Sequence, residues 1–324
     1  MSKYLLVLDF DETIAHTFEP SPNEMNVAKS YSLAVEEVLS TEGTKIYDGQ
    51  GGLNNRAPQE VVHDILVGST PTQREIILGT ARQFLQERRH QLNGLVREGM
   101  GAPLEWKDGK DPVSIVAELL VRSKLGHTLR EVCDVWPRPT LGFETFYPSL
   151  SDLRAEGVDV DVAVVSSGHD LFIEKVFEMW DLEKPRILVT DDTIRGLTYP
   201  KEVDRRVKPS AFPLALAHYK WMKEHELVDR RMNARRVAED TRPYIAFIGD
   251  DPNKDGGMAA RARILFGQFE ESSLYESGRS DGTFKFGDWN DLGKLMNARR
   301  GLMKEGRSFD EILLSPYGRS PERL

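Results

Sequence analysis

Two closely spaced pairs of carboxylates follow short apolar runs of the chain. One pair is Asp9 and Asp11, and the other is Asp250 and Asp251. An isolated buried carboxylate is costly, so two such pairs indicate a compensating cation. Mg²⁺ prefers oxygen ligands and commonly shares its site with a phosphate group. The pattern therefore predicts a magnesium site that binds phosphate.

These pairs need strands that hold them side by side. Five short, continuous apolar runs predict strands buried in a parallel sheet, at residues 4–8, 160–165, 186–190, 244–248 and 263–266. We expect Gly267 to end the fifth strand. Helical spacing of apolar residues between the later runs predicts an α/β fold. In an open sheet of this kind, ligands bind at the carboxyl ends of the strands, where both acidic pairs and Ser166 stand.

The segment between about residues 20 and 140 has a different pattern. Apolar residues recur at helical spacing over residues 26–39, 59–66, 73–95 and 112–120, and no convincing apolar strand interrupts them. We therefore predict a helical domain at residues 19–141, inserted after the first strand of a core that comprises residues 1–18 and 142–300. The charged residues 301–324 should add a short helix and a loose tail.

Four segments resemble, in order, the motifs of the haloacid dehalogenase (HAD) superfamily. The first, at residues 9–13, reads Asp-Phe-Asp-Glu-Thr and has the family's Asp-x-Asp-x-Thr pattern directly after a strand. Ser166 is similar to the second motif, Lys208 to the third, and residues 249–255 to the fourth. The resemblance implies a Rossmann-like parallel sheet core with a mainly helical cap of the C1 type, inserted after the first strand.

The resemblance also implies a role for each motif residue. Asp9 would attack phosphorus and form a transient aspartyl-phosphate. The side chain of Asp11 would act as general acid and then as general base. Ser166 and Lys208 would bind the phosphoryl oxygens. Ser167 competes with Ser166 for that role, since either hydroxyl could instead cap the next helix.

The metal site implied by the resemblance would use Asp9, the backbone carbonyl of Asp11, and Asp250. Asp255 or Asp251 would bind the metal or orient a ligand, although Asp251 could instead interact with a helix dipole.

Other positions carry weaker signals. Lys201 is an alternative to Lys208, which the following proline and helix favour. A glycine-rich stretch at residues 49–56 could bring Asn55 and Arg56 onto a substrate, or simply connect two helices. His169 could face the ligand-binding crevice or only start a helix. The single cysteine, Cys133, excludes an intrachain disulfide, fits a reducing cytoplasm, and is expected to be buried.

These features together predict a magnesium-dependent phosphatase that hydrolyses a small phosphate monoester. Residues 9–16 also resemble the Asp-Leu-Asp-Glu-Thr-Leu-Val-His signature of phosphatases that act on the RNA polymerase tail, but the long insert argues against a phosphoprotein substrate. A phosphotransferase would share the same core residues. A non-catalytic binding protein on the same core would not need both Asp9 and Asp11, and dehalogenases of the family do not carry the second aspartate.

Composition limits the partners of the protein. The formal net charge is −9, and an acidic surface repels nucleic acid and anionic membranes. No stretch approaches the ~20 apolar residues of a membrane span, and the run before Asp9 is too short for a secretory signal. We therefore expect a cytoplasmic protein whose partner is a small phosphorylated metabolite. The sequence does not indicate an oligomeric state.

Overall fold

The computed structural model describes residues 3–39, 58–95, 104–106, 111–197, 206–228, 233–277 and 282–315. The chain divides into two compact units. The first, which we call the sheet unit, comprises Met1–His16, Arg138–Ile173 and Trp180–Leu324. The second, the helical unit, comprises Thr17–Pro137 and Glu174–Met179.

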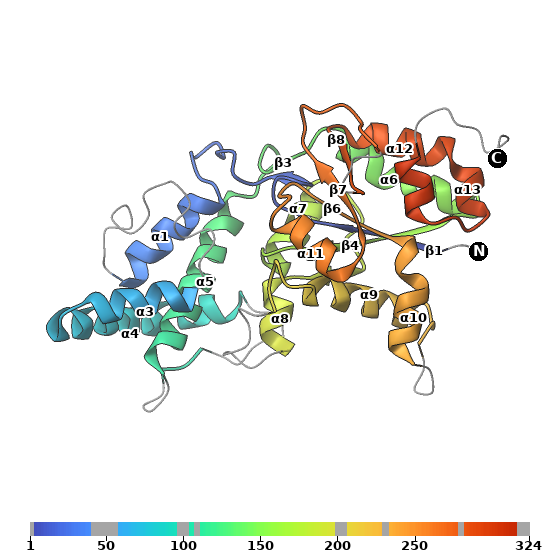
Figure 1. Cartoon of the computed structure of the whole chain (residues 1–324). Helices are drawn as coiled ribbons and strands as arrows, with labels where there is room; N and C mark the ends of the chain where they lie inside the picture. The colour runs from blue at the N-terminus through green and yellow to red at the C-terminus, as the bar shows by residue number, and fades with distance from the viewer. Residues whose placement is uncertain are drawn as a thin grey trace. The chain divides into compact units, whose positions relative to one another are not determined.

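The sheet unit is built on six parallel strands in the order β5-β4-β1-β6-β7-β8 (Figure 1). These strands are β1 (Lys3–Leu8), β4 (Asp159–Val165), β5 (Ile187–Val189), β6 (Ile245–Gly249), β7 (Leu265–Phe269) and β8 (Phe284–Phe286). The predicted α/β, Rossmann-like class is confirmed. Along the chain, β4 and β5 are added on one side of β1, and β6, β7 and β8 are then added on its other side. The order of the strands therefore reverses between β1 and β6, which is where open α/β sheets bind ligands.

Helices cover both faces of this sheet (Figure 1). On one face, α9 (Phe212–Glu224) and α11 (Asp255–Ala262) bury apolar residues against β1 and β6. On the other face, α6 (Phe143–Ala155) packs against α12 (Trp289–Ala298), and the rings of Phe146 and Trp289 lie 5.1 Å apart. The remaining helices of the unit are α7 (Asp170–Met179), whose last turns belong to the helical unit, α8 (Asp191–Leu197), α10 (Ala234–Thr241) and α13 (Arg300–Lys304), with a 3₁₀ turn at Arg242–Tyr244.

One expectation about the end of the sheet is wrong, and the C-terminal segment differs in part from its prediction: α13 is the predicted short helix, while residues 316–324 of the predicted tail lie outside the described residues. Gly267 does not end the fifth predicted strand, because β7 continues to Phe269 and pairs Gly267 with Phe284 of β8. A Cβ at Gly267 would lie 2.3 Å from the Phe284 ring, so the glycine permits this close pairing. The described part of the C-terminal segment is not loose. Tyr4 donates hydrogen bonds to the carbonyls of Met303 and Arg307, and a π-helical turn at Asp310–Leu314 buries Ile312 and Leu313.

The helical unit has its own hydrophobic core. Its described helices are α1 (Val27–Leu39), α3 (Pro58–Gly68), α4 (Pro71–Asn93) and α5 (Pro112–Glu131). Apolar residues of all four are buried together, as their helical spacing predicts. The unit is therefore a packed insert and not an extended loop.

The chain leaves and re-enters the sheet unit through two short strands that pair with each other. These are β2 (Ala15–His16) and β3 (Arg138–Pro139), which run antiparallel. Glu271 contacts both connections. Its carboxylate lies 3.3 Å from His16 Nε2 and accepts the Leu141 N–H at 2.9 Å. Both connections to the insert therefore stand close together, a few residues from Asp11.

No helix among the described residues has both the length and the apolar character needed to cross a membrane.

Candidate active site

Asp9 follows β1 and Asp250 follows β6, so both acidic segments stand where the strand order reverses. The Asp9 N–H continues the pairing of the two strands by donating to the Ile248 carbonyl at 2.8 Å. The carboxylates of Asp9, Asp250 and Asp255 come together here, with one oxygen of each within 4.8 Å of the others. Asp255 is the first residue of α11, which packs against β6 and β7. Two strands and one helix therefore position the three acids.

Lys208 lies at the centre of this carboxylate cluster. Its Nζ donates to Asp9 Oδ1 at 2.5 Å and to Asp255 Oδ1 at 2.8 Å, and all three side chains are buried. Burial by itself would lower the pKa of Lys208, but the charges of Asp255 and Asp9 raise it, so this lysine stays protonated. The side chain is long enough to reach the acids from the loop that precedes α9.

One lysine does not balance three carboxylates, of which those of Asp9 and Asp255 are buried and that of Asp250 is partly buried. Burial and the neighbouring Asp255 raise the pKa of Asp9 well above its usual range, although Lys208 partly opposes them. Burial and Asp255 likewise raise the pKa of Asp250 to about 6. Lys208 therefore keeps its charge, while both acids are destabilised as anions, first by their burial and then by the negative charge of Asp255. A hard divalent cation bound by these oxygens would compensate the negative charge, so the donor set fits Mg²⁺.

Thr13 and Asp251 support the cluster without belonging to it. The Thr13 hydroxyl donates to Asp250 Oδ1 at 3.3 Å. Sequence reasoning quoted this threonine within the first motif but assigned it no role. Asp251 Oδ1 accepts the N–H groups of Asn253 and Lys254 at 2.8 and 3.0 Å, as a cap of the turn before α11 does. Of the two candidates for the supporting acid, Asp255 lies in the cluster, and the Asp251 side chain stabilises a turn.

The loop after β4 brings Ser166 towards Asp11. Ser166 is buried, and its hydroxyl accepts the Gly168 N–H at 2.9 Å. A Cβ at Gly168 would lie 3.1 Å from Ser166 Oγ and 3.9 Å from Asp11 Oδ2, so both side chains flank this glycine. Ser167 is less buried than Ser166. The carboxylate of Asp11 is not one of the three acids that meet around Lys208.

His169 is held by Asp192, a residue that the sequence did not single out. Its Nδ1 lies 3.1 Å from Asp192 Oδ1, and the Asp170 N–H donates to the same carboxylate at 3.2 Å. The Thr190 hydroxyl donates to Asp170. These contacts tie the loop that carries Ser166 to the loop after β5. No sequence spacing relates His169 to Asp192, so only the pairing of β4 with β5 reveals this contact.

Other predicted residues do not join the site. Cys133 is exposed, and the prediction that it is buried is wrong because it lies in a tight turn closed by the Cys133–Trp136 backbone hydrogen bonds. Asn55, Arg56 and the glycine-rich stretch around them lie outside the described residues. The same is true of Lys201, the alternative to Lys208.

No protein-family model matches the chain. No curated protein matches it either. Solved structures similar to it include a 2-haloacid dehalogenase from Pseudomonas syringae pv. Tomato, with 15% identity, coverage of 92% of this chain and 99% of that one, and a TM-score of 0.40. An HAD phosphatase from Thermococcus onnurineus has 13% identity, coverage of 92% and 99%, and a TM-score of 0.37. An HAD family hydrolase from Deinococcus radiodurans, with bound phosphate and sodium, has 12% identity, coverage of 93% and 97%, and a TM-score of 0.37. Likenesses this low do not assign the chain to a family or choose between the two named reactions.

Proposed function

We propose that this protein is a Mg²⁺-dependent phosphatase that hydrolyses a small phosphate monoester through an aspartyl-phosphate on Asp9. One observation carries the proposal. Lys208 and three carboxylates, two of them buried, meet at the point of the sheet where the strand order reverses, and the carboxylates hold more negative charge than the lysine neutralises. Such a site suits a divalent cation together with the oxygens of a phosphoryl group.

The proposed reaction has two steps. In the first, Asp9 Oδ attacks phosphorus, a bond forms between them, and the bond from phosphorus to the leaving oxygen breaks while Asp11 donates a proton to that oxygen. In the second, Asp11 takes a proton from water, the water oxygen attacks phosphorus, and the bond to Asp9 breaks. The step restores both aspartates and releases inorganic phosphate.

The surrounding residues would stabilise this transfer. Lys208 and the Ser166 hydroxyl would bind phosphoryl oxygens, and Ser167 is the alternative to Ser166. Asp9, Asp250, Asp255 and the backbone carbonyl of Asp11 would hold Mg²⁺, which when bound neutralises charge on the phosphoryl oxygens. Thr13 would orient Asp250 through its hydrogen bond.

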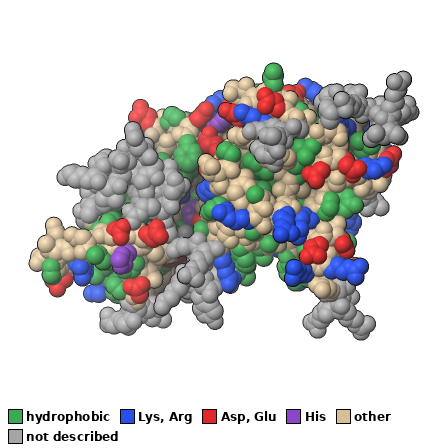
Figure 2. Space-filling model, viewed as in Figure 1, with side chains coloured by type: hydrophobic (Ala, Val, Ile, Leu, Met, Phe, Trp, Pro, Cys, Tyr) green, Lys and Arg blue, Asp and Glu red, His purple; other side chains and the backbone are tan. Residues whose placement is uncertain are grey.

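The proposed substrate class rests on the size of the insert. Roughly 120 residues separate the first strand from the rest of the core, far more than an ordinary connecting loop. Their helices bury a core of their own, and both connections leave the sheet unit beside the loop that carries Asp9 and Asp11. We propose that the insert acts as a cap, which restricts the substrate to a small phosphorylated metabolite. Acidic and basic side chains are interspersed on the face seen in Figure 2, and the net charge of −9 disfavours a polyanionic partner.

The test is phosphate release from a panel of phosphorylated sugars, amino acids and a generic aryl phosphate, with Mg²⁺ and with EDTA. We expect turnover that EDTA abolishes and Mg²⁺ restores. Asp9→Asn should be inactive but folded by circular dichroism, and the exposed Asp291→Asn should be fully active. Full activity of Asp9→Asn would overturn the mechanism. Higher kcat/KM on phosphopeptides or phosphorylated oligonucleotides would overturn the substrate class and favour a protein phosphatase.

A further inference from the structure

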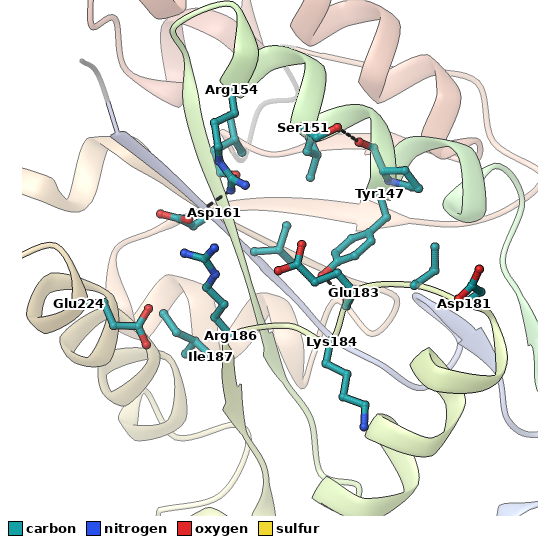
Figure 3. Close-up of a pocket in the computed structure, with 15 residues that line it drawn as sticks. Tyr147, Ser151, Arg154, Asp161, Asp181, Glu183, Lys184, Arg186, Ile187 and Glu224 are labelled. Atoms are coloured by element: carbon teal, nitrogen blue, oxygen red, sulfur yellow. Dashed lines mark hydrogen bonds and ion pairs between the residues drawn. The ribbon is translucent and has the colours of Figure 1, made fainter.

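A second pocket lies in the sheet unit, away from the carboxylate cluster. Its volume is about 280 Å³, and α6, β4, α9 and the segment that leads into β5 line it (Figure 3). Asp161, the third residue of β4, contributes to this pocket, whereas Ser166 follows the other end of the same strand. At about 3.3 Å per residue, the two positions are roughly 17 Å apart.

Hydrogen bonds hold the walls of this second pocket in place. Asp161 accepts the indole N–H of Trp221 at 2.8 Å and lies 2.5 Å from His225 Nε2. Arg154 lies 3.1 Å from Asp159 and 3.5 Å from Asp161. On the opposite wall, the Tyr147 hydroxyl donates to the Glu183 carbonyl at 2.9 Å and fixes the segment before β5. The pocket is therefore preformed, as small-molecule sites usually are.

Charged side chains of both signs line the pocket without an ion pair among the described residues: Arg186 on the basic side, and Asp181, Glu183 and Glu224 on the acidic side. Among the described residues, neither the guanidinium of Arg186 nor the carboxylate of Glu224 makes a hydrogen bond or an ion pair. In Figure 3, Arg186 extends from the start of β5 towards Asp161 and Arg154. Glu224 is the last residue of α9, where a negative charge is unfavourable next to the negative end of the helix dipole. Lys220, one turn earlier on α9, interacts with the charge of Glu224, and a cationic ligand group would add to that compensation.

The charges of the lining determine which class of ligand fits. A simple anion would meet the carboxylates of Glu183 and Glu224, and a simple cation would meet the guanidiniums of Arg154 and Arg186. A molecule that carries both charges avoids both conflicts. The lining also has an apolar part, formed by Leu150, Val162, Leu182 and Ile187, beside the charged Asp181 and Lys184. Its volume lies at the low end of ligand pockets, which suits a small metabolite.

We propose that this pocket binds a small zwitterion of the α-amino-acid class with an apolar side chain. The carboxylate of the ligand would pair with Arg186, its ammonium group with Glu224, and its side chain would pack against the apolar lining. This proposal is independent of phosphatase activity, because none of these residues belongs to the carboxylate cluster.

Isothermal titration calorimetry on the full chain tests the pocket, with L-leucine, L-isoleucine, L-valine and L-methionine as probes. We expect saturable binding of at least one of them. Arg186→Gln and Glu224→Gln should each weaken that binding by about tenfold or more, because each removes a charge-assisted hydrogen bond. Both side chains are exposed, so the two variants should fold. Arg235→Gln, on the exposed face of α10, is the matched control and should bind normally.

Two analogues and one variant sharpen the result. 4-Methylpentanoate lacks the amine and isoamylamine lacks the carboxylate, so neither should bind as well as L-leucine. Asp9→Asn should bind the amino acid normally, which separates this pocket from the proposed active site. The proposal is overturned if none of the four amino acids binds, if either analogue binds as tightly as L-leucine, or if binding survives in both Arg186→Gln and Glu224→Gln.

Discussion

At the level of single residues, the Lys208 ammonium group has more acidic neighbours than it can neutralise. It donates to Asp9 and Asp255, while Asp250 lies in the same cluster with a raised pKa. Removing one partner of a buried ion pair leaves the other charge without compensation. The lysine should therefore matter for stability as well as for the proposed chemistry.

We predict that Lys208→Met lowers the free energy of unfolding by roughly 3–5 kcal/mol at pH 7 in EDTA. Phosphate release should fall by about 100-fold or more, since a cation that binds the phosphoryl group is lost. Urea denaturation and an aryl phosphate assay measure the two effects. Lys294→Met, at an exposed position, should change neither. A Lys208→Met protein of wild-type stability would contradict the buried pairing.

Asp250 and Asp251 are neighbours with different surroundings, which makes them a matched pair. Asp250→Ala removes a carboxylate of the cluster and should raise the Mg²⁺ concentration needed for half-maximal activity by about tenfold or more. Asp251→Ala removes only the cap of a turn, so it should cost about 1 kcal/mol of stability and leave the Mg²⁺ requirement unchanged. A magnesium titration of both variants tests this contrast. A raised Mg²⁺ requirement in Asp251→Ala but not in Asp250→Ala would show that Asp250 is not the metal ligand.

At the level of elements, the close approach of β6 to α11 depends on a residue without a side chain. A Cβ on Gly249 would lie 2.3 Å from Asp255 Oδ2 and 2.7 Å from Asp255 Cβ. The last residue of β6 must therefore be small if the first residue of α11 is to reach Lys208. This packing explains in physical terms why glycine precedes Asp250.

We predict that Gly249→Ala displaces Asp255, lowers the free energy of unfolding by about 1–3 kcal/mol and reduces phosphate release. Gly79→Ala is the control, because Gly79 lies within α4 with open space around it. That substitution should instead stabilise the protein by about 0.5–1 kcal/mol, through a lower backbone entropy of the unfolded chain and a better helix propensity. Thermal unfolding of both variants measures the contrast, and an unperturbed Gly249→Ala protein would argue against the tight packing at Asp255.

Over the whole molecule, His218 couples stability to pH. It is buried between α9 and α10, and its Nε2 lies 2.8 Å from Thr241 Oγ1. Burial, helped by Arg242, lowers the pKa of His218 from 6.5 to about 4. Between these two values the unfolded chain binds a proton that the folded chain does not, so stability falls as the pH drops from about 6.5 to about 4.

We predict that this single group removes about 3 kcal/mol of unfolding free energy over that pH range, since the two pKa values differ by about 2.5. His218→Gln should lose this part of the pH dependence. The stability gap between wild type and His218→Gln should be constant above about pH 7 and narrow below pH 6. Urea denaturation at several pH values measures it, and His63→Gln, at an exposed position, should behave as wild type. Parallel curves for wild type and His218→Gln would contradict the assignment.

Local sequence patterns determined the main outline of this protein. Continuous apolar runs predicted β1, β4, β5, β6 and β7, because buried parallel strands need apolar residues on both faces. They also placed Asp9, Ser166 and Asp250 after strand ends. Short elements with little apolar signal escaped detection, including β8 and the paired β2 and β3.

Only the tertiary structure decided which of these residues meet. The order of the strands brings β1 next to β6, and so Asp9 next to Asp250, across more than 230 residues of sequence. The tertiary contacts also distinguish the two candidate acids: Asp255 lies in the cluster with Lys208, whereas Asp251 caps a turn. Spacing along a chain limits what neighbouring residues can do. It does not determine contacts between distant residues, because those depend on how the strands pair and on which side chains the packed helices bring within reach.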